Sequence, residues 1–237
     1  MKSRRSSLSK QRGFSVLSGF ILAIVMFGTL AFFLGGQGIN SSFGTTYSNT
    51  SKASGLLTSA GYITTGFNAV TMSGQLPSAV TFDAAANTGI FNPTSGGATQ
   101  QALDPTLFVG VDAAATATAA ATGLRGYWIY RRGDVRLNGV GTSATGDYTI
   151  MATGLKQAVC QQINATLTGT ANTVAPPTLT GVSEAQLVAA SLPAANSNST
   201  VSGLAVDLST LSNAGDLNGC YATSDSVYVY IHTLLPQ

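Results

Sequence analysis

The most informative segment of the chain is FSVLSGFILAIVMFGTLAFFL, residues 14–34, which contains 21 residues and no charge. At about 1.5 Å per residue, a helix of this length spans roughly 30 Å, the thickness of the hydrocarbon core of a bilayer. Five basic residues lie within the first twelve positions, whereas the next basic residue after the stretch is Lys52. The positive-inside rule therefore predicts a transmembrane helix with a cytoplasmic N-terminus and an exported region after Leu34.

Beyond its first twelve residues the chain is weakly charged. The 237 residues include eleven basic and nine acidic ones, and five of the basic residues lie in the leader, so the remainder carries a net charge of −3. This balance predicts no extended phosphate-binding surface, and nucleic acid is not an expected partner. One His, one Glu and two Cys offer few groups for a hydrolytic or zinc site. We therefore expect no enzyme activity, no metal and no cofactor.

A glycine separates the basic leader from the apolar segment, in the order Arg12-Gly13-Phe14-Ser15-Val16-Leu17. This boundary resembles the class III signal of type IV prepilins, in which a membrane-embedded peptidase cuts after the glycine and methylates the new N-terminus. The resemblance implies cleavage between Gly13 and Phe14 and N-methylation of Phe14. A cleaved secretory signal fits less well, because such signals have apolar cores of about 7 to 15 residues. A plain signal anchor stays open as an alternative.

One position departs from the prepilin pattern. The fifth residue of the cleaved chain would be Ser18, where the family usually has Glu. In the family this Glu is thought to pair with the N-terminal amine of a neighbouring subunit, since a charge in an apolar filament core is costly unless it is paired. Loss of the Glu is typical of a minor pseudopilin at a filament tip, although filament-forming members also vary here. A major and a minor subunit both stay open.

An amphipathic helix is expected to continue from the apolar one. Its apolar residues recur at intervals of three and four, as in Leu56, Ala60, Ile63, Phe67 and Val70. The resemblance implies the same long helix, with its second half packed on a sheet. The expected organisation is a leader at 1–13, a transmembrane and filament-core helix at 14–34, an amphipathic continuation at 35–72 and a globular head at 73–237.

Three strands and one further helix are predicted in the head. Residues 126–132 and 147–152 are rich in aromatic and β-branched side chains and are expected to pair as antiparallel strands, and residues 226–235 alternate as a last strand. Thr153 is expected to cap a helix over 154–167. The apolar stripe of that helix would be Leu155, Val159, Ile163 and Leu167.

The rest of the head reads as loops. Residues 72–124 and the stretches around Pro176 and Pro193 are rich in turn residues. The fold class expected from the resemblance is α+β and pilin-like, with the long N-terminal helix packed on an antiparallel sheet and a disulfide closing the C-terminal region.

The two cysteines, Cys160 and Cys220, allow one intramolecular pairing. Export would place them in an oxidising compartment, which predicts a disulfide, with two free thiols as the alternative. The bond would close a segment of about 60 residues and contribute roughly 4 kcal/mol by loop entropy. A C-terminal disulfide that joins a helix to a late strand also resembles the type IVb pilins.

A set of four arginines and the single histidine are the candidate polar sites. Four of the six basic residues outside the leader are Arg125, Arg131, Arg132 and Arg136. They are expected to form a solvated hairpin edge, where charge blocks edge-to-edge pairing; contact with a neighbouring subunit, DNA or another anionic surface is the alternative. The lone histidine, His232, is expected to be a surface or partly buried structural residue.

The resemblance implies a structural subunit of a type IV pilus-like filament, of the IVb kind, that supports adhesion, aggregation or motility. Its partners would be copies of itself or related pilins, the prepilin peptidase, the inner-membrane assembly platform and, before assembly, membrane lipid. It would lie in the inner membrane of a bacterium and then in an extracellular filament or a periplasmic pseudopilus. A minor pilin or type II secretion pseudopilin, and a signal-anchored periplasmic binding domain, are the alternatives.

Overall fold

The computed structural model describes residues 39–99, 101–109, 125–137, 146–169, 171–188, 199–201, 206–208 and 218–237. The chain divides into two compact units, Met1–Ser48 and Asn49–Gln237. The predicted cleavage site, the apolar segment 14–34 and Ser18 lie outside the described residues. The sheet and its two hydrophobic cores belong to the second unit.

A long helix, α2, runs over Ile39–Met72. Its buried hydrophobic residues in the second unit recur every three or four positions and are Ala53, Leu56, Ala60, Ile63, Phe67 and Val70. The predicted apolar stripe is therefore buried, and the helix also continues through the polar stretch 48–54. Beyond Met72 the chain turns at Gly74, which has a φ of 93° and donates its N–H to the carbonyl of Thr71 over 3.0 Å.

A glycine in α2 permits a loop to cross the helix closely. A Cβ on Gly66 would lie 2.7 Å from Ile90 Cγ2 and 2.7 Å from the Ala98 Cβ, closer than real carbon atoms approach. The loop that follows α2 can therefore bury Ile90 against the helix only because position 66 has no side chain. As predicted, the described part of 72–124 holds loops with two short 3₁₀ turns, η1 (Pro77–Ala79) and η2 (Pro105–Leu107).

Six strands form one sheet in the order β3-β1-β2-β6-β5, with β4 also paired to β1. The strands are β1 (Ile129–Leu137), β2 (Asp147–Leu155), β3 (Ser199–Val201), β4 (Val206–Leu208), β5 (Asn218–Ala222) and β6 (Tyr228–Leu235). The predicted antiparallel pairing of the first two is confirmed, and β6 lies antiparallel between β2 and β5.

The outer edge of the sheet differs from the expectation. Strands β3 and β4 pair with β1 in parallel, at 129–131 and 135–137 respectively. The sequence around them, rich in Ser and Asn, reads as exposed loop, because three-residue strands are too short to show alternation. The sheet is therefore antiparallel through β1, β2, β6 and β5 and parallel at the β1 edge.

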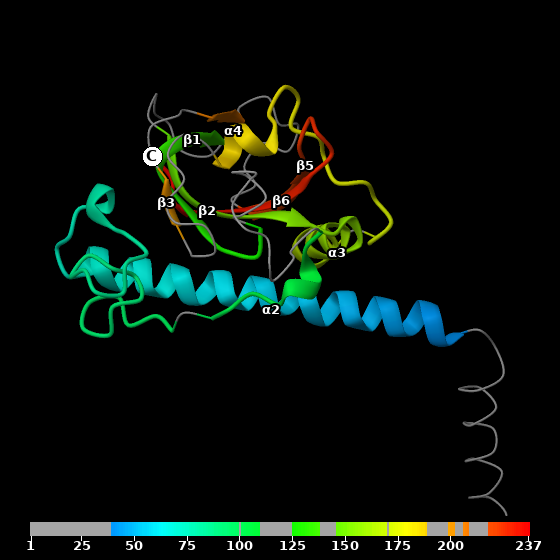
Figure 1. The fold of residues 1–237 in the computed structure, drawn as a ribbon, viewed down its shortest axis with the longest axis horizontal. Coiled ribbons are helices and arrows are strands. Elements are labelled where there is room, and N and C mark those ends of the chain that lie inside the picture. Colours follow the sequence, from blue (N-terminus) through cyan, green and yellow to red (C-terminus); the bar gives the residue numbers. More distant parts are fainter. Residues whose placement is uncertain are drawn as a thin grey trace, which may run out of the picture. The chain divides into compact units, whose positions relative to one another are not determined.

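Each face of the sheet is covered by a separate core, and Figure 1 shows α2 and α4 on opposite sides of it. On one face of the sheet, side chains such as Tyr130, Ile150 and Tyr230 pack with the buried stripe of α2 and form the first core. On the opposite face, a second core is formed by the strand residues Ile129, Met151, Val229 and Ile231 together with Leu179, Val182, Leu187 and Val188. The predicted alternation of β6 is thus confirmed, with both faces buried.

Helix α3 begins later than predicted. It spans Gln157–Thr168, and Lys156 takes the N-cap position. Thr153 does not cap it, because β2 continues to Leu155 with an irregularity at Gly154, which has a φ of 76°. The sequence prediction was wrong here because Leu155 fits both the helical stripe and the strand.

A short helix that the sequence analysis missed covers the second core. Helix α4 spans Glu184–Val188. Ser183 and Gln186 hold its start with reciprocal bonds, since the Ser183 N–H donates to Gln186 Oε1 over 2.8 Å and the Gln186 N–H donates to Ser183 Oγ over 3.3 Å. This is a capping box, so the pattern Ser183-Glu-Ala-Gln186 was the available signal.

Candidate functional site

The predicted disulfide is confirmed. Cys160 of α3 is bonded to Cys220 of β5, with a Cα–Cα distance of 5.3 Å, and both residues are fully buried. The bond ties the helix after β2 to the edge strand of the sheet. It therefore closes the segment between α3 and β5, and β6 follows that segment in the chain.

An asparagine covers the sheet edge beside the disulfide. Asn164 Nδ2 donates to the carbonyl of Cys220 over 2.7 Å, and the N–H of Cys220 donates to Asn164 Oδ1 over 2.8 Å. The side-chain amide thus pairs with β5 as another strand would. Two residues on, the backbone of Ala222 bonds with Pro177 and Leu179. These contacts occupy outward-facing groups of β5 that would otherwise be open to another chain.

The four arginines do not gather into one solvated edge. Arg131 is fully buried and donates from Nη1 to the carbonyl of Leu187 over 2.7 Å. Arg132 donates to the carbonyl of Ser78 over 3.0 Å, and Arg136 is exposed. The expectation of a solvated edge is therefore wrong for Arg131, whose guanidinium joins β1 to the helix on the second core.

Arg125 forms a bidentate ion pair with Glu184, the one glutamate of the chain. Its Nε lies 2.9 Å from Oε1 and its Nη2 lies 2.6 Å from Oε2. Hydrogen bonding to Glu184 raises the pKa of Arg125 above its usual value. The side chain also passes over Gly154, where a Cβ would lie 2.4 Å from Arg125 Cδ. The pair fastens the N-terminus of α4 against the residues before β1.

His232 is partly buried, as predicted for a structural histidine. Its Nε2 lies 2.8 Å from Thr64 Oγ1 on α2, and its Nδ1 lies 3.3 Å from the hydroxyl of Tyr230. Burial lowers the pKa of His232 to about 4. At neutral pH the imidazole is uncharged and joins the last strand to the long helix.

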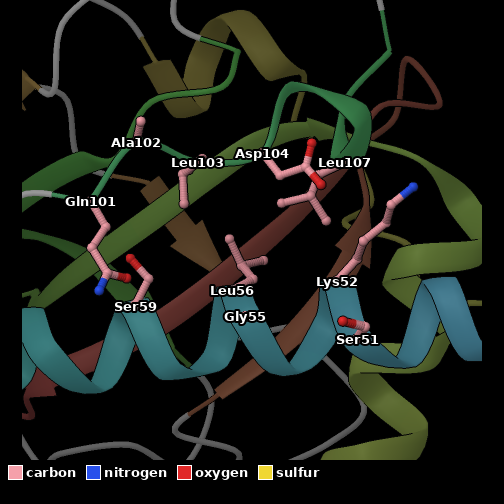
Figure 2. A pocket seen from close by; sticks show the side chains of 10 residues that line it. All are labelled: Ser51, Lys52, Gly55, Leu56, Ser59, Gln101, Ala102, Leu103, Asp104 and Leu107. Carbon is pink, nitrogen blue, oxygen red and sulfur yellow. The ribbon is translucent and has the colours of Figure 1, made fainter.

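Figure 2 shows a cleft between α2 and the segment that contains η2. Leu56, Leu103 and Leu107 line it, together with the polar residues Ser51, Lys52, Ser59, Gln101 and Asp104. Two of these polar groups already bind within the chain, because Ser59 Oγ accepts from Trp128 Nε1 over 3.0 Å and Asp104 Oδ1 accepts from the Thr106 N–H over 2.9 Å.

The outer face of α2 consists of small or uncharged residues. Along the second unit the exposed positions include Ser54, Thr58, Gly61, Tyr62, Thr65, Asn68 and Met72. A Cβ on Gly61 would meet nothing within 4 Å. The one charged residue of the helix, Lys52, lies beside the cleft of Figure 2. This face, which we call the outer stripe, allows another helix to approach closely without burying a charge.

The described residues contain neither a candidate metal site nor a membrane-spanning helix. No group of three or more His, Cys, Asp or Glu side chains there is placed to hold a metal ion. Among the same residues, no helix combines the length and the hydropathy needed to cross a bilayer. The apolar segment 14–34 lies outside that part of the chain.

Comparison with protein-family models, with curated proteins and with solved structures found no match to this chain. The function is therefore argued from the residues and their geometry.

Proposed function

We propose that this protein is a structural subunit of a type IV pilus-like filament, of the IVb kind, that assembles through its N-terminal helix after cleavage at Gly13. The observation that carries the proposal is the ordered boundary of basic leader, Gly13, Phe14 and uninterrupted apolar segment. In this proposal the apolar helix leaves the lipid for a bundle of equivalent helices. The head then lies on the filament surface for adhesion, aggregation or motility.

Two features of the head support this proposal. The buried stripe of α2 packs on a largely antiparallel sheet, and a disulfide closes the C-terminal region, which is the architecture that the resemblance implies. The outer stripe is uncharged and contains Gly61, so it suits contact with helices of other subunits. Partners in this account are copies of the chain or related pilins, the prepilin peptidase, the assembly platform and membrane lipid before assembly.

Processing is tested by the change Gly13→Leu. We expect the wild-type chain to appear in filaments sheared from the cell surface, without residues 1–13 and with one added methyl group. The variant should stay uncut in the membrane fraction and leave no filaments, because the residue before the scissile bond is altered. Intact-mass spectrometry of both fractions measures this, with Gln11→Ala in the leader as the control. An uncut wild-type chain confined to the membrane would contradict the proposal and favour a signal-anchored periplasmic module.

The outer stripe is tested by the change Gly61→Phe. Since a Cβ at this position meets nothing within 4 Å, the free energy of unfolding of the head should change by less than about 1 kcal/mol, the helix-propensity difference included. Filament yield should fall at least tenfold, because a ring would hold neighbouring helices apart. The control is Thr166→Phe, at an exposed position of α3. Normal filament yield from a cleaved Gly61→Phe chain would exclude the outer stripe from the subunit contact.

A minor pilin or type II secretion pseudopilin is the second candidate, favoured by Ser18 in place of the usual Glu. A subunit with Ser18 cannot offer the carboxylate that pairs with a neighbour's N-terminal amine. The abundance of the cleaved chain in the sheared fraction separates the two roles. A major subunit dominates that fraction, whereas a priming or tip subunit is scarce in it or remains in a periplasmic pseudopilus.

A further inference from the structure

The hydrogen bonds around His232 determine which nitrogen carries its proton. Thr64 Oγ1 donates its hydrogen to the carbonyl of Ala60 over 2.9 Å, so it can only accept at its 2.8 Å contact with His232 Nε2. The hydrogen therefore lies on Nε2, and Nδ1 is left as an acceptor. Tyr230 supplies the donor, 3.3 Å away. Burial raises the pKa of Tyr230, which keeps its hydroxyl protonated.

No charged group in the described part of the chain is placed to balance a proton on this imidazole. The register partners of His232 are Ile150 on β2 and Asn218 on β5. The other titratable side chains packed on this core are Tyr130, Tyr148 and Tyr228. On α2 the one charged residue is Lys52, three turns before Thr64 and itself a cation.

Protonation of His232 would also disrupt its hydrogen bond with Tyr230. A proton on Nδ1 would turn that atom into a donor that faces the Tyr230 hydroxyl, itself a donor in the neutral arrangement. The hydroxyl would have to rotate away, and the imidazolium would remain partly buried without a counter-ion.

We propose that His232, Thr64 and Tyr230 form an acid-sensitive tie, which docks α2 on the sheet while the imidazole is neutral and loosens this docking when the imidazole takes up a proton. The tie joins β6, the last strand, to the middle of α2, so it acts on the contact between the helix and the head. It does not depend on filament assembly.

The direction of the pH effect follows from burial, which lowers the pKa of His232 from 6.5 to about 4 in the folded chain. The unfolded chain then binds more protons than the folded chain between these values. The contribution of the tie is complete above pH 6.5 and is lost as the pH falls toward 4. The full difference, reached only below pH 4, corresponds to a factor on the order of 100 in the equilibrium between docked and undocked α2.

The test uses the full chain in detergent micelles, where the single histidine gives one set of imidazole signals. Nitrogen-15 NMR at pH 7 should show the neutral Nε2–H form, and the signals should titrate near pH 4. Thr64→Val removes the acceptor and should mix the two tautomers. Thr65→Val removes an equivalent bond to the carbonyl of Gly61 that does not touch His232, and it should leave the tautomer unchanged. An Nδ1–H form or an imidazolium at pH 7 would overturn the proposal.

Hydrogen exchange measures the docking itself. Between pH 7 and pH 3.5, the protection of α2 amides around Thr64, corrected for intrinsic exchange, should fall on the order of 100-fold more in the wild type than in His232→Gln, whose amide does not titrate. Carboxylates titrate in both chains and cancel in this comparison. The same loss of protection in the two chains would overturn the proposal.

Discussion

Replacing Arg125 with methionine is expected to lower the free energy of unfolding by about 3 to 5 kcal/mol. The side chains of Arg125 and Glu184 are 14% and 4% exposed, so the substitution would leave a carboxylate buried without its two hydrogen bonds. Most of this loss is the cost of burying a carboxylate without a partner. The net stabilisation by the ion pair itself is smaller, because both groups also lose hydration when they are buried. Glu184 begins α4, and the second core beneath that helix should loosen with it.

Urea unfolding of the full chain, followed by circular dichroism at pH 7, measures the effect of Arg125→Met. Arg136→Met serves as the matched control, since Arg136 is exposed on β1, and it should shift the free energy by no more than about 0.5 kcal/mol. The double change Arg125→Met with Glu184→Gln should recover part of the stability, because it removes the unpaired charge. Equal losses in Arg125→Met and Arg136→Met would contradict the assigned role of the pair.

Removing the disulfide by the double change Cys160→Ala and Cys220→Ala is expected to lower the free energy of unfolding by about 4 kcal/mol. The two cysteines are separated by 60 residues. Without the bond the unfolded chain gains the conformational entropy of a loop of this size, which lowers its free energy by about 4 kcal/mol. The closed segment contains α4, β3, β4 and the start of β5. The sheet edge at β5 should suffer most, although Asn164 still pairs with the backbone of residue 220.

This second prediction is checked by urea unfolding with and without reductant. The wild-type chain should lose about 4 kcal/mol on reduction, whereas the double variant should be insensitive to it. Hydrogen exchange at β5 should accelerate on reduction more than exchange at β2, which lies at the centre of the sheet. A wild-type chain with the same stability in oxidised and reduced form would contradict the stabilising role of the bond.

The hydrophobic periodicity of the sequence predicted most of the longer helices and strands. The stripe from Leu56 to Val70 and the alternation of β6 lie where the sequence placed them, whereas β1 runs over Ile129–Leu137 and only overlaps the predicted strand at 126–132. Each pattern extends over two or more repeats, so its hydrophobic period can be recognised in the sequence. The cysteine pairing could also be predicted, because two cysteines allow a single bond and export favours it.

Short elements and contacts between distant residues could not be predicted in the same way. Strands β3 and β4 have three residues each and form by pairing with the edge of β1. The start of α3 was misplaced because Leu155 satisfied two patterns at once. The partner of Arg125 lies 59 residues away, and no local rule joins them.

The amino-acid sequence alone indicates the apolar segment with its glycine boundary, the amphipathic helix, the main strands and the one disulfide that the cysteines allow. These features depend on composition and on periods of two to four residues, which are local properties of the chain. The packing of the folded chain, in contrast, buries Arg131, pairs Glu184 with Arg125, covers the β5 edge with Asn164 and brings His232 to Thr64. Each of these contacts joins residues far apart in the sequence, where burial and hydrogen bonding are set by how the layers pack and not by neighbouring residues.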